Sequence, residues 1–267
     1  MKAITSEANP RYRRWLRIAG TPRAVREEGQ TLAEGIHLAQ AALAAGAAVA
    51  AVLLRKGAAH ADLDALLAQL SGIDGYELPA PLYERLAPVE QGAGLMLVLP
   101  VADAALPSRA PADMVYLDGI QDPGNAGALL RSAAAAGVRH VLAGPGTAAL
   151  WAPRVLRAAM GAHFRLAIHE RVVAAQLPQV LDGTWIAAVA HDAPSIWAQA
   201  LPQGPIGWVF GAEGSGPSAA ALAASQLRVC IPTSAAVESL NVAAAAAVCL
   251  FERMRQSAGP APSKSLQ

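Results

Sequence analysis

The sequence predicts an α/β protein of two domains, the second of them built on a mainly parallel β-sheet. From residue 113 onward, apolar strand-like runs alternate with helical stretches, the pattern of a parallel sheet covered by helices on both faces. Residues 100–112 hold Pro100, Pro107 and Pro111 without sustained periodicity, which indicates a linker. A chain of 267 residues is long enough for two compact domains.

The N-terminal part, residues 1–99, is expected to be a small α/β domain. Apolar residues recur at near-helical spacing over 31–44, and residues 47–54 then form a predicted buried strand. Residues 62–70 predict an amphipathic helix, and residues 94–99 predict another strand.

The second part alternates predicted strands with predicted helices. The predicted strands are residues 114–118, 139–144, 164–169, 185–190, 206–211 and 227–231. The predicted helices include residues 126–136, 154–160 and 240–256. Residues 258–267 are polar and rich in proline and serine, so we expect a disordered tail there.

Composition predicts a globular protein that stays inside the cell. Apolar residues make up 54% of the chain, charged residues 15%, and the formal net charge is +1, which is not the composition of a disordered or coiled-coil protein. The first residues lack the apolar core of a signal peptide. The uncharged run 41–54 is too short for a bilayer core of roughly 30 Å. We therefore expect a cytoplasmic protein without a membrane partner.

Neither the cysteines nor the histidines are spaced for metal binding. Cys230 and Cys249 form no CxxC pair, so neither a disulfide framework nor a zinc site is indicated. The six histidines also lack ligand spacing. We expect no metal, and we expect both cysteines to be small buried residues.

Arginines gather near the N-terminus with aromatic residues between them. Residues 11–26 include Tyr12 and Trp15 and contain no acid. Arginine suits phosphate contacts and aromatic rings suit base stacking, so this stretch is a candidate RNA-binding face. On these residues alone, a solvated amphipathic helix is an equal alternative. The candidate RNA-binding residues are Arg11, Arg13, Arg14, Arg17, Arg23 and Arg26.

Three predicted strand ends in the second domain carry polar residues, and ligands of open parallel sheets bind at such ends. In the first stretch, residues 117–137, the strand stops at Asp118, and Asn125 and Arg131 follow a Pro-Gly turn. Both have plainer alternatives, because Asn125 could be a helix N-cap and Arg131 a surface arginine.

The second and third strand ends are also polar. The second, residues 208–218, places Glu213 among glycines whose backbone can approach a ligand, although it is not a dinucleotide-binding GxGxxG pattern. The third, residues 232–241, places Glu238, Ser239 and Asn241 before an alanine-rich helix. A cap at Ser239 with Glu238 beside the positive helix end is the simpler interpretation, but three polar groups exceed what one cap requires.

Together these stretches resemble the signature motifs of the SpoU family, also called TrmH-like, of RNA ribose 2′-O-methyltransferases in the SPOUT superfamily. The resemblance rests on DPGNAGALLRSAAAAG, FGAEGSGPS and IPTSAAVESLNVAAAAAVCLFE, which occur in the family's order and spacing. Upstream, REEGQTLAEGIHLAQAAL resembles the start of an N-terminal RNA-binding domain that is similar to ribosomal protein L30e.

The resemblance implies a domain plan and a fold. An L30e-like RNA-binding domain would cover residues 1–99, with a linker over 100–112 and a methyltransferase domain over 113–257, before the tail at 258–267. The methyltransferase domain would contain a deep trefoil knot, an exception to the rule that chains avoid knots. It would also pair as a homodimer that completes the active site across the interface.

The resemblance further implies S-adenosylmethionine as cofactor and RNA as partner, ribosomal RNA in preference to transfer RNA. The cofactor pocket would lie in loops 143–146, 211–216 and 231–241. The implied cofactor-binding residues are Gly144, Gly211, Glu213, Gly214, Ile231, Leu240 and Asn241. The implied catalytic residues are Asn125, Arg131, Glu213, Ser239 and Asn241.

The chemistry constrains these roles. A ribose hydroxyl must be aligned with the methyl donor and must lose its proton, while the neutral, activated leaving group requires no metal. An arginine, with a pKa above about 12, is a poor base. We therefore expect Arg131 to bind the neighbouring phosphate and stabilise the developing alkoxide, with the proton acceptor left open.

Two other classes compete with this interpretation. An RNA-binding or ribosome-assembly factor without catalysis would keep the same fold, although the intact polar set argues against it. A nucleotide-cofactor oxidoreductase predicts a glycine-rich turn after the first strand of the second domain, where the sequence has DGIQDPGN instead.

Overall fold

The computed structural model describes residues 1–87, 92–101, 104–234 and 239–257. The chain forms two compact units, each described here by itself. Unit 1 comprises residues 1–104, 122–127 and 148–165, and unit 2 comprises residues 105–121, 128–147 and 166 onward. The predicted tail, residues 258–267, and part of the predicted linker lie outside the described residues.

Unit 1 contains a five-stranded mixed sheet with the strand order β1-β4-β3-β5-β2. Strands β1, β4 and β3 run parallel, and β5 is antiparallel to both β3 and β2. The strands are β1 (Lys2–Ala3), β2 (Gln30–Glu34), β3 (Ala51–Arg55), β4 (Gly75–Leu78) and β5 (Leu95–Pro100). The helices are α1 (Pro10–Gly20), α2 (Pro22–Glu28), α3 (Ile36–Ala44), α4 (Leu63–Gln69), α5 (Ala80–Glu84), α7 (Pro153–Ala159) and the 3₁₀ helix η1 (Ala162–Arg165).

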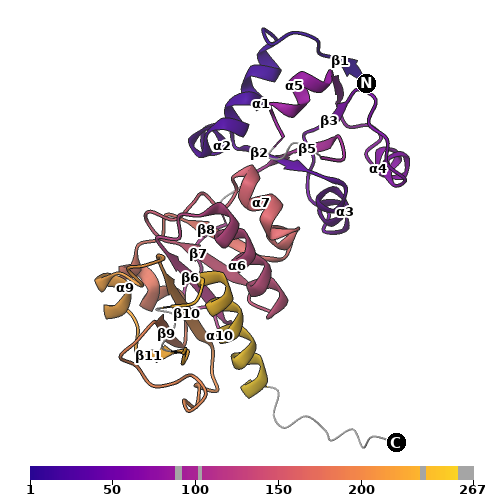
Figure 1. Ribbon diagram of the computed structural model, residues 1–267. Helices are drawn as coiled ribbons and strands as arrows, with labels where there is room; N and C mark the ends of the chain where they lie inside the picture. Colours follow the sequence, from indigo (N-terminus) through magenta and orange to yellow (C-terminus); the bar gives the residue numbers. More distant parts are fainter. Residues whose placement is uncertain (88–91, 102–103, 235–238, 258–267) are drawn as a thin grey trace, which may run out of the picture. The chain divides into compact units, whose positions relative to one another are not determined.

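Both faces of this sheet are buried. Alternate residues of β5 point to opposite faces, so that Met96 and Val98 pack with α1 and α5 while Leu95 and Leu97 pack with α3 and α4. Figure 1 shows these two pairs of helices on opposite sides of the sheet. Such two-sided burial explains why β5, whose sequence is LMLVLP, is wholly apolar.

The structure corrects one predicted helix in unit 1. Residues 31–34 of the predicted helix 31–44 belong to strand β2, and only residues 36–44 are helical. β2 pairs antiparallel with β5, and residues 31–34 are all buried. Gly35, with φ +113°, separates the two elements. Sheet pairing therefore outweighs the helical spacing of the apolar residues.

Unit 2 contains a six-stranded, all-parallel sheet with the order β11-β9-β10-β6-β7-β8, which confirms the predicted α/β class. The strands are β6 (Met114–Asp118), β7 (His140–Ala143), β8 (Ala167–Glu170), β9 (Thr184–Val189), β10 (Ile206–Gly211) and β11 (Leu227–Cys230). The helices are α6 (Pro123–Ala135), whose first residues belong to unit 1, η2 (Ala174–Gln176), α8 (Leu177–Val180), α9 (Ala219–Ala223) and α10 (Val242–Ser257).

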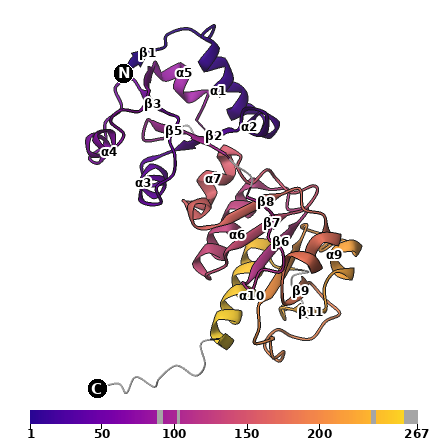
Figure 2. The same cartoon turned by 180° about the vertical axis from the view of Figure 1, so that it is seen from behind.

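Helices cover both faces of this sheet. Helix α10 packs against β9 and β10, whereas Leu177 of α8 and Ala221 of α9 join a core on the other face with Trp185 and Val209. Figure 2 shows α9 and α10 on opposite sides of the strands. Among the predicted strands, 164–169 is shorter than expected, because residues 162–165 form η1. No helix in the described ranges is long and apolar enough to cross a membrane.

Candidate active site

A pocket of about 380 Å³ lies in unit 2 at the carboxyl ends of β9, β10 and β11. Its walls come from residues 188–190 after β9, residues 210–217 after β10, and the segments on either side of the undescribed residues 235–238. These are the ends at which an open parallel sheet binds its ligands. The second and third polar stretches of the sequence therefore come together here.

The turn after β10 requires glycine at its first position. A Cβ on Gly211 would stand 1.9 Å from the backbone nitrogen of Pro217 and 2.0 Å from the carbonyl carbon of Gly216. The turn closes through a hydrogen bond from the Gly216 N–H to the Ala212 carbonyl at 2.9 Å, and Gly214 has φ +86°. This close return of the chain places backbone groups and the exposed Glu213 on the pocket wall.

The first polar stretch holds this turn in place. Asp118, the last residue of β6, is buried, and its Oδ2 accepts a hydrogen bond from the Ser218 N–H at 2.6 Å. Ser218 in turn caps α9 by accepting from the Ala221 N–H. Asp118 is therefore a support for the glycine turn, a role that the sequence alone did not reveal.

The third stretch both lines the pocket and caps a helix. Ser239, Leu240 and Asn241 are pocket residues. The Asn241 side-chain oxygen accepts from the N–H groups of Ala243 at 2.9 Å and Ala244 at 3.3 Å. The alternative of a cap at Ser239 is therefore wrong, because α10 begins at Val242 and its cap is Asn241. Glu238 lies outside the described residues.

Asn125 and Arg131 lie on α6 and not in the pocket wall. The N-cap alternative for Asn125 is wrong, because the Oδ1 of Asp122 accepts the Asn125 N–H at 2.7 Å and caps the helix itself. Asn125 is half-buried in the first turn, and Arg131 is exposed later on the same helix. Asp122, and not Asn125, therefore caps α6.

Gly144 is the one predicted cofactor residue that does not line the pocket. It is buried just after β7, its N–H donates to the Leu117 carbonyl at 2.8 Å, and a Cβ there would stand 2.2 Å from the Tyr116 hydroxyl. Burial raises the pKa of Tyr116 to about 12, so this hydroxyl stays protonated and donates to the Val172 carbonyl. Packing against β6 explains the glycine.

Sequence reasoning missed the wall that β9 contributes. Residues 188–190 line the pocket, but nothing in their small apolar side chains indicates a ligand. Their part depends on the strand order, which places β9 between β10 and β11. Only the sheet topology could have identified them.

Neither cysteine lines the pocket, and the prediction that both are buried is wrong for Cys230, which is half-buried. Among the described residues, no three histidine, cysteine or acidic side chains come together as metal ligands. Cys249 is buried in α10, which raises the pKa of its thiol to about 12, and the Cys230 thiol donates to the Ala193 carbonyl. Both cysteines are free thiols.

The model of the SpoU rRNA methylase family matches residues 113–251, which include all three motif stretches and the pocket. This chain belongs to the SpoU rRNA methylase family.

Relatives of this SpoU protein match it over most of the chain. The 23S rRNA (guanosine(2553)-2′-O)-methyltransferase RlmP of Bacillus subtilis is 30% identical over 260 residues, covering 94% of this chain and 98% of that protein. A crystal structure of an RNA 2′-O ribose methyltransferase matches with a TM-score of 0.80 at 29% identity, covering 95% of this chain and 98% of that one. An AdoMet-bound rRNA methyltransferase from Sinorhizobium meliloti has the same fold, with a TM-score of 0.82 at 21% identity, over 95% of this chain and 97% of that one.

In unit 1 of this SpoU protein, the arginine-rich stretch forms α1 and α2, and its aromatic residues face inward. Tyr12 is fully buried and donates to the Leu82 carbonyl, and Trp15 packs edge-on against Tyr76 at 5.2 Å. The prediction that Tyr12 or Trp15 stacks on RNA bases is therefore wrong, because both rings are buried. The arginines lie on the opposite, exposed face of an amphipathic helix.

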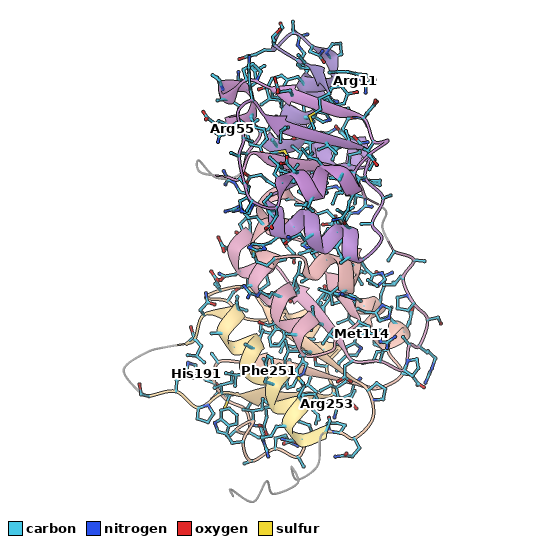
Figure 3. All side chains as sticks on the ribbon, turned by 90° about the vertical axis from the view of Figure 1, so that its right-hand side faces the viewer. Arg11, Arg55, Met114, His191, Phe251 and Arg253 are labelled. Atoms are coloured by element: carbon cyan, nitrogen blue, oxygen red, sulfur yellow. The ribbon has the colours of Figure 1, made fainter. Side chains whose placement is uncertain are left out.

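Acids from outside the stretch contact several of these arginines. Glu28 pairs with both Arg14 and Arg17, and Glu27 pairs with Arg23. Arg11 instead lies over the Tyr76 ring, 5.3 Å from its centroid, near the top of Figure 3. The face is consequently less positive than the sequence run suggested.

Proposed function

We propose that the protein is an S-adenosylmethionine-dependent methyltransferase that modifies a ribose 2′-hydroxyl of ribosomal RNA. The observation that carries this proposal is the pocket at the ends of β9, β10 and β11, which is built from two of the three SpoU motif stretches. The Bacillus subtilis relative is named as a 23S rRNA guanosine 2′-O-methyltransferase, and this favours ribosomal RNA as the substrate class.

The pocket suits the proposed cofactor. Its volume falls within the range of about 300–1,000 Å³ that is usual for small-molecule sites. Phe210, Ile231 and Leu240 offer apolar surface for an adenine ring, and the backbone of residues 211–214 offers hydrogen-bonding groups for the polar parts. When bound, S-adenosylmethionine would supply an activated methyl group on a sulfonium. Glu213, Gly214 and Asn241 would complete its site, and Gly144 would support it from β7.

The remaining polar residues would act on the RNA. Arg131 would bind the phosphate next to the reacting ribose and stabilise the alkoxide as the proton leaves. Asn125, on the same helix, would place the nucleotide, and Ser239, Glu213 and Asn241 would orient the ribose. Holding donor and acceptor in one geometry would supply much of the rate enhancement, since alignment removes an entropic cost.

The finer architecture follows the family resemblance. Residues 1–99 would form an L30e-like RNA-binding domain whose contacts include Arg11, Arg13, Arg14, Arg17, Arg23 and Arg26. Residues 113–257 would form the catalytic domain with its deep trefoil knot. Modification of ribosomal RNA would place the protein in the cytoplasm. A knot is testable by adding a bulky fused domain at the C-terminus, which should slow refolding markedly if the terminus must thread a loop.

Unit 2 would form a homodimer through the exposed face of α10. Phe251 and Met254 lie three positions apart and are 48% and 42% exposed, and Phe251 is labelled on this helix in Figure 3. An exposed apolar face of this kind indicates an interaction surface. Phe251→Glu should yield monomers in light scattering and lower activity, whereas Gln179→Glu, at an exposed position of α8 on the other face of the sheet, should leave a dimer. A dimeric Phe251→Glu variant would contradict this interface.

Mapping ribose methylation across total RNA tests the function directly. Cells lacking the protein should lose one or a few 2′-O-methyl sites in ribosomal RNA, and the purified protein with S-adenosylmethionine should restore them. Calorimetry should also detect binding of S-adenosylmethionine. An unchanged map together with no cofactor binding would favour the assembly-factor alternative.

A further inference from the structure

The pocket of unit 2 differs in charge from a second pocket, of about 680 Å³, that lies in unit 1. The wall of the unit 1 pocket carries two acids and two arginines, whose charges balance. These residues are Glu34, Asp122, Arg154 and Arg157. The described wall of the unit 2 pocket instead carries one charged side chain, Glu213, and no lysine, arginine or histidine. A positively charged ligand therefore meets no like charge on the described part of that wall.

A further acid, Asp118, lies directly behind this wall. It ends β6 and pairs in the sheet with Gly211, the wall residue that ends β10, and neighbouring strands lie about 4.8 Å apart. Its Oδ2 accepts the Ser218 N–H at 2.6 Å, and Ser218 directly follows the wall residue Pro217. The carboxylate is therefore one residue away from the pocket wall, although Asp118 does not line the pocket itself.

No cation offsets the charge of Asp118. The residue is 9% exposed, and it forms no ion pair with the described residues. A buried charge is screened less by water and salt than a surface charge, so its field reaches farther. An asparagine could accept the same N–H of Ser218 at a lower cost of burial. The negative charge of Asp118 therefore adds something that the hydrogen bond alone does not.

The proposed cofactor and its product differ in charge at one atom. S-adenosylmethionine carries a positive sulfonium, and when the methyl group moves to the ribose oxygen, the sulfur keeps the electron pair of the broken bond. The product, S-adenosylhomocysteine, is then a neutral thioether with all other groups unchanged. Because the two molecules would make nearly the same contacts in one pocket, a nearby negative charge is a means of telling them apart.

We propose that the buried charge of Asp118 makes the unit 2 pocket select the sulfonium cofactor over its neutral product, an inference that rests on the proposed function. Asp118 is a specificity-determining residue and not a catalytic one, because it acts through its field and does not line the pocket. For opposite charges about two strand spacings apart and partly screened, the attraction changes affinity roughly five-fold. Methyl transfer removes this attraction, which favours exchange of the product for a new cofactor.

Calorimetry with three ligands tests the selection. The ligands are S-adenosylmethionine, S-adenosylhomocysteine and sinefungin, an analogue that carries a charged amine in place of the S-methyl group. Asp118→Asn keeps an acceptor for the Ser218 N–H and removes the charge. We expect Kd to rise roughly five-fold for the two cationic ligands and to stay within about two-fold for S-adenosylhomocysteine. Three unchanged Kd values would overturn the proposal, and so would an equal rise in all three, which would show that Asp118 only supports the turn.

Asp113→Asn is the matched control at the opposite end of the same strand. Asp113 precedes β6, and its Oδ1 accepts the Ile206 N–H at 2.8 Å, much as Asp118 accepts an N–H. Asp113 also pairs with Arg253, and neither residue lines the pocket. Five positions of extended chain place it about 16 Å from Asp118, so the ratio of the Kd values should stay at the wild-type value. An equal change of this ratio in both Asn variants would contradict the role of Asp118.

A second pair of variants covers the case in which Asp118→Asn does not fold. Asp118→Glu and Asp118→Gln are of equal length and differ in charge, so the Gln variant should show the same roughly five-fold loss for the cationic ligands relative to the Glu variant. If the wild type binds none of the three ligands, the proposed function fails and this inference with it. Tight binding with an unchanged Kd ratio in the neutral variants would overturn the role of Asp118 alone.

Discussion

The two pockets of this molecule are built from different materials. The pocket of unit 2 is shaped by backbone and apolar side chains, with a glycine turn that tolerates no side chain. The pocket of unit 1 is defined by charge, with two arginines around a buried acid and an uncapped helix. The first construction favours one small molecule of fixed shape, whereas in the second the two arginines are balanced by two carboxyl groups. Under the proposed function, unit 2 would carry the methyl-transfer chemistry and the arginines of unit 1 would contact RNA, and both expectations can be measured.

The largest expected effect comes from Arg131. Arg131→Ala should lower kcat by about 10²–10³-fold, because loss of one group that stabilises developing charge has this typical magnitude. Its Kd for S-adenosylmethionine should stay at the wild-type value, since Arg131 does not line the cofactor pocket. Single-turnover methylation and calorimetry provide the two measurements.

Two further variants make the Arg131 test specific. Arg131→Lys keeps the charge without the planar donors and should recover only part of the activity. Arg139→Ala removes another exposed arginine of unit 2 and should be silent. Near-normal turnover in Arg131→Ala would contradict the role proposed for Arg131 in methyl transfer.

The next effect concerns the shape of the cofactor pocket. Gly211→Ala places a methyl group against the backbone of residues 216 and 217, so the turn must move. We expect the affinity for S-adenosylmethionine to fall by about 100-fold, which is about 2.7 kcal/mol. Gly204→Ala is the matched control, because a Cβ there meets no atom within 4 Å. Equal cofactor affinities for the two variants would show that the glycine turn is not part of the site.

Much of the fold could be predicted from sequence, and the reason lies in the strands of unit 2. Residues 206–211 were predicted as a strand to the residue, because a fully buried parallel strand is a short, continuous apolar run between turn residues. Unit 1 was harder. Residues 30–34, QTLAE, form no continuous apolar run, and their strand state depends on antiparallel pairing with β5, about 65 residues later in the chain.

The pocket residues also differ in how far the sequence could predict them. Glu213, Ser239 and Asn241 were found because each follows a strand in a polar cluster, and all three line one pocket. The pocket of unit 1 gave no local signal, because Glu34 and Arg157 are 123 positions apart and each is unremarkable in its own segment. Side chains that meet only through tertiary structure leave no pattern in a window of sequence.

Acid should affect unit 1 through His163. Burial lowers the pKa of His163 to about 4, and its Nε2 is bonded to the Leu150 carbonyl at 2.7 Å. The unfolded chain takes up this proton near pH 6.5 and the folded one only near pH 4, so stability falls as pH decreases between these values. From pH 6.5 to pH 5 the loss should be roughly 2 kcal/mol, and it should end below about pH 4.

Chemical denaturation across this pH range measures the contribution. His163→Gln keeps a donor for Leu150 but does not titrate, so its stability should vary less between pH 6.5 and pH 5. His191→Gln removes an exposed histidine of unit 2, labelled in Figure 3, and should keep the wild-type pH profile. An unchanged profile in His163→Gln would mean that acid sensitivity arises elsewhere.

The smallest expected effect is on RNA affinity, when single arginines of the arginine-rich face are replaced. It tests which of these arginines contact the RNA in the proposed function. Arg17 shares Glu28 with Arg14, whereas Arg26 is exposed and has no ion pair with the described residues. An arginine that is already balanced by an acid displaces few counterions when it binds RNA, so Arg17→Ala should leave the salt slope nearly unchanged. Arg26→Ala should lower the slope by about 0.7–0.9 and the affinity by less than about 1 kcal/mol. If both variants lower it equally, Glu28 must release its arginines when RNA binds, and the face would be more positive in the complex than in the free protein.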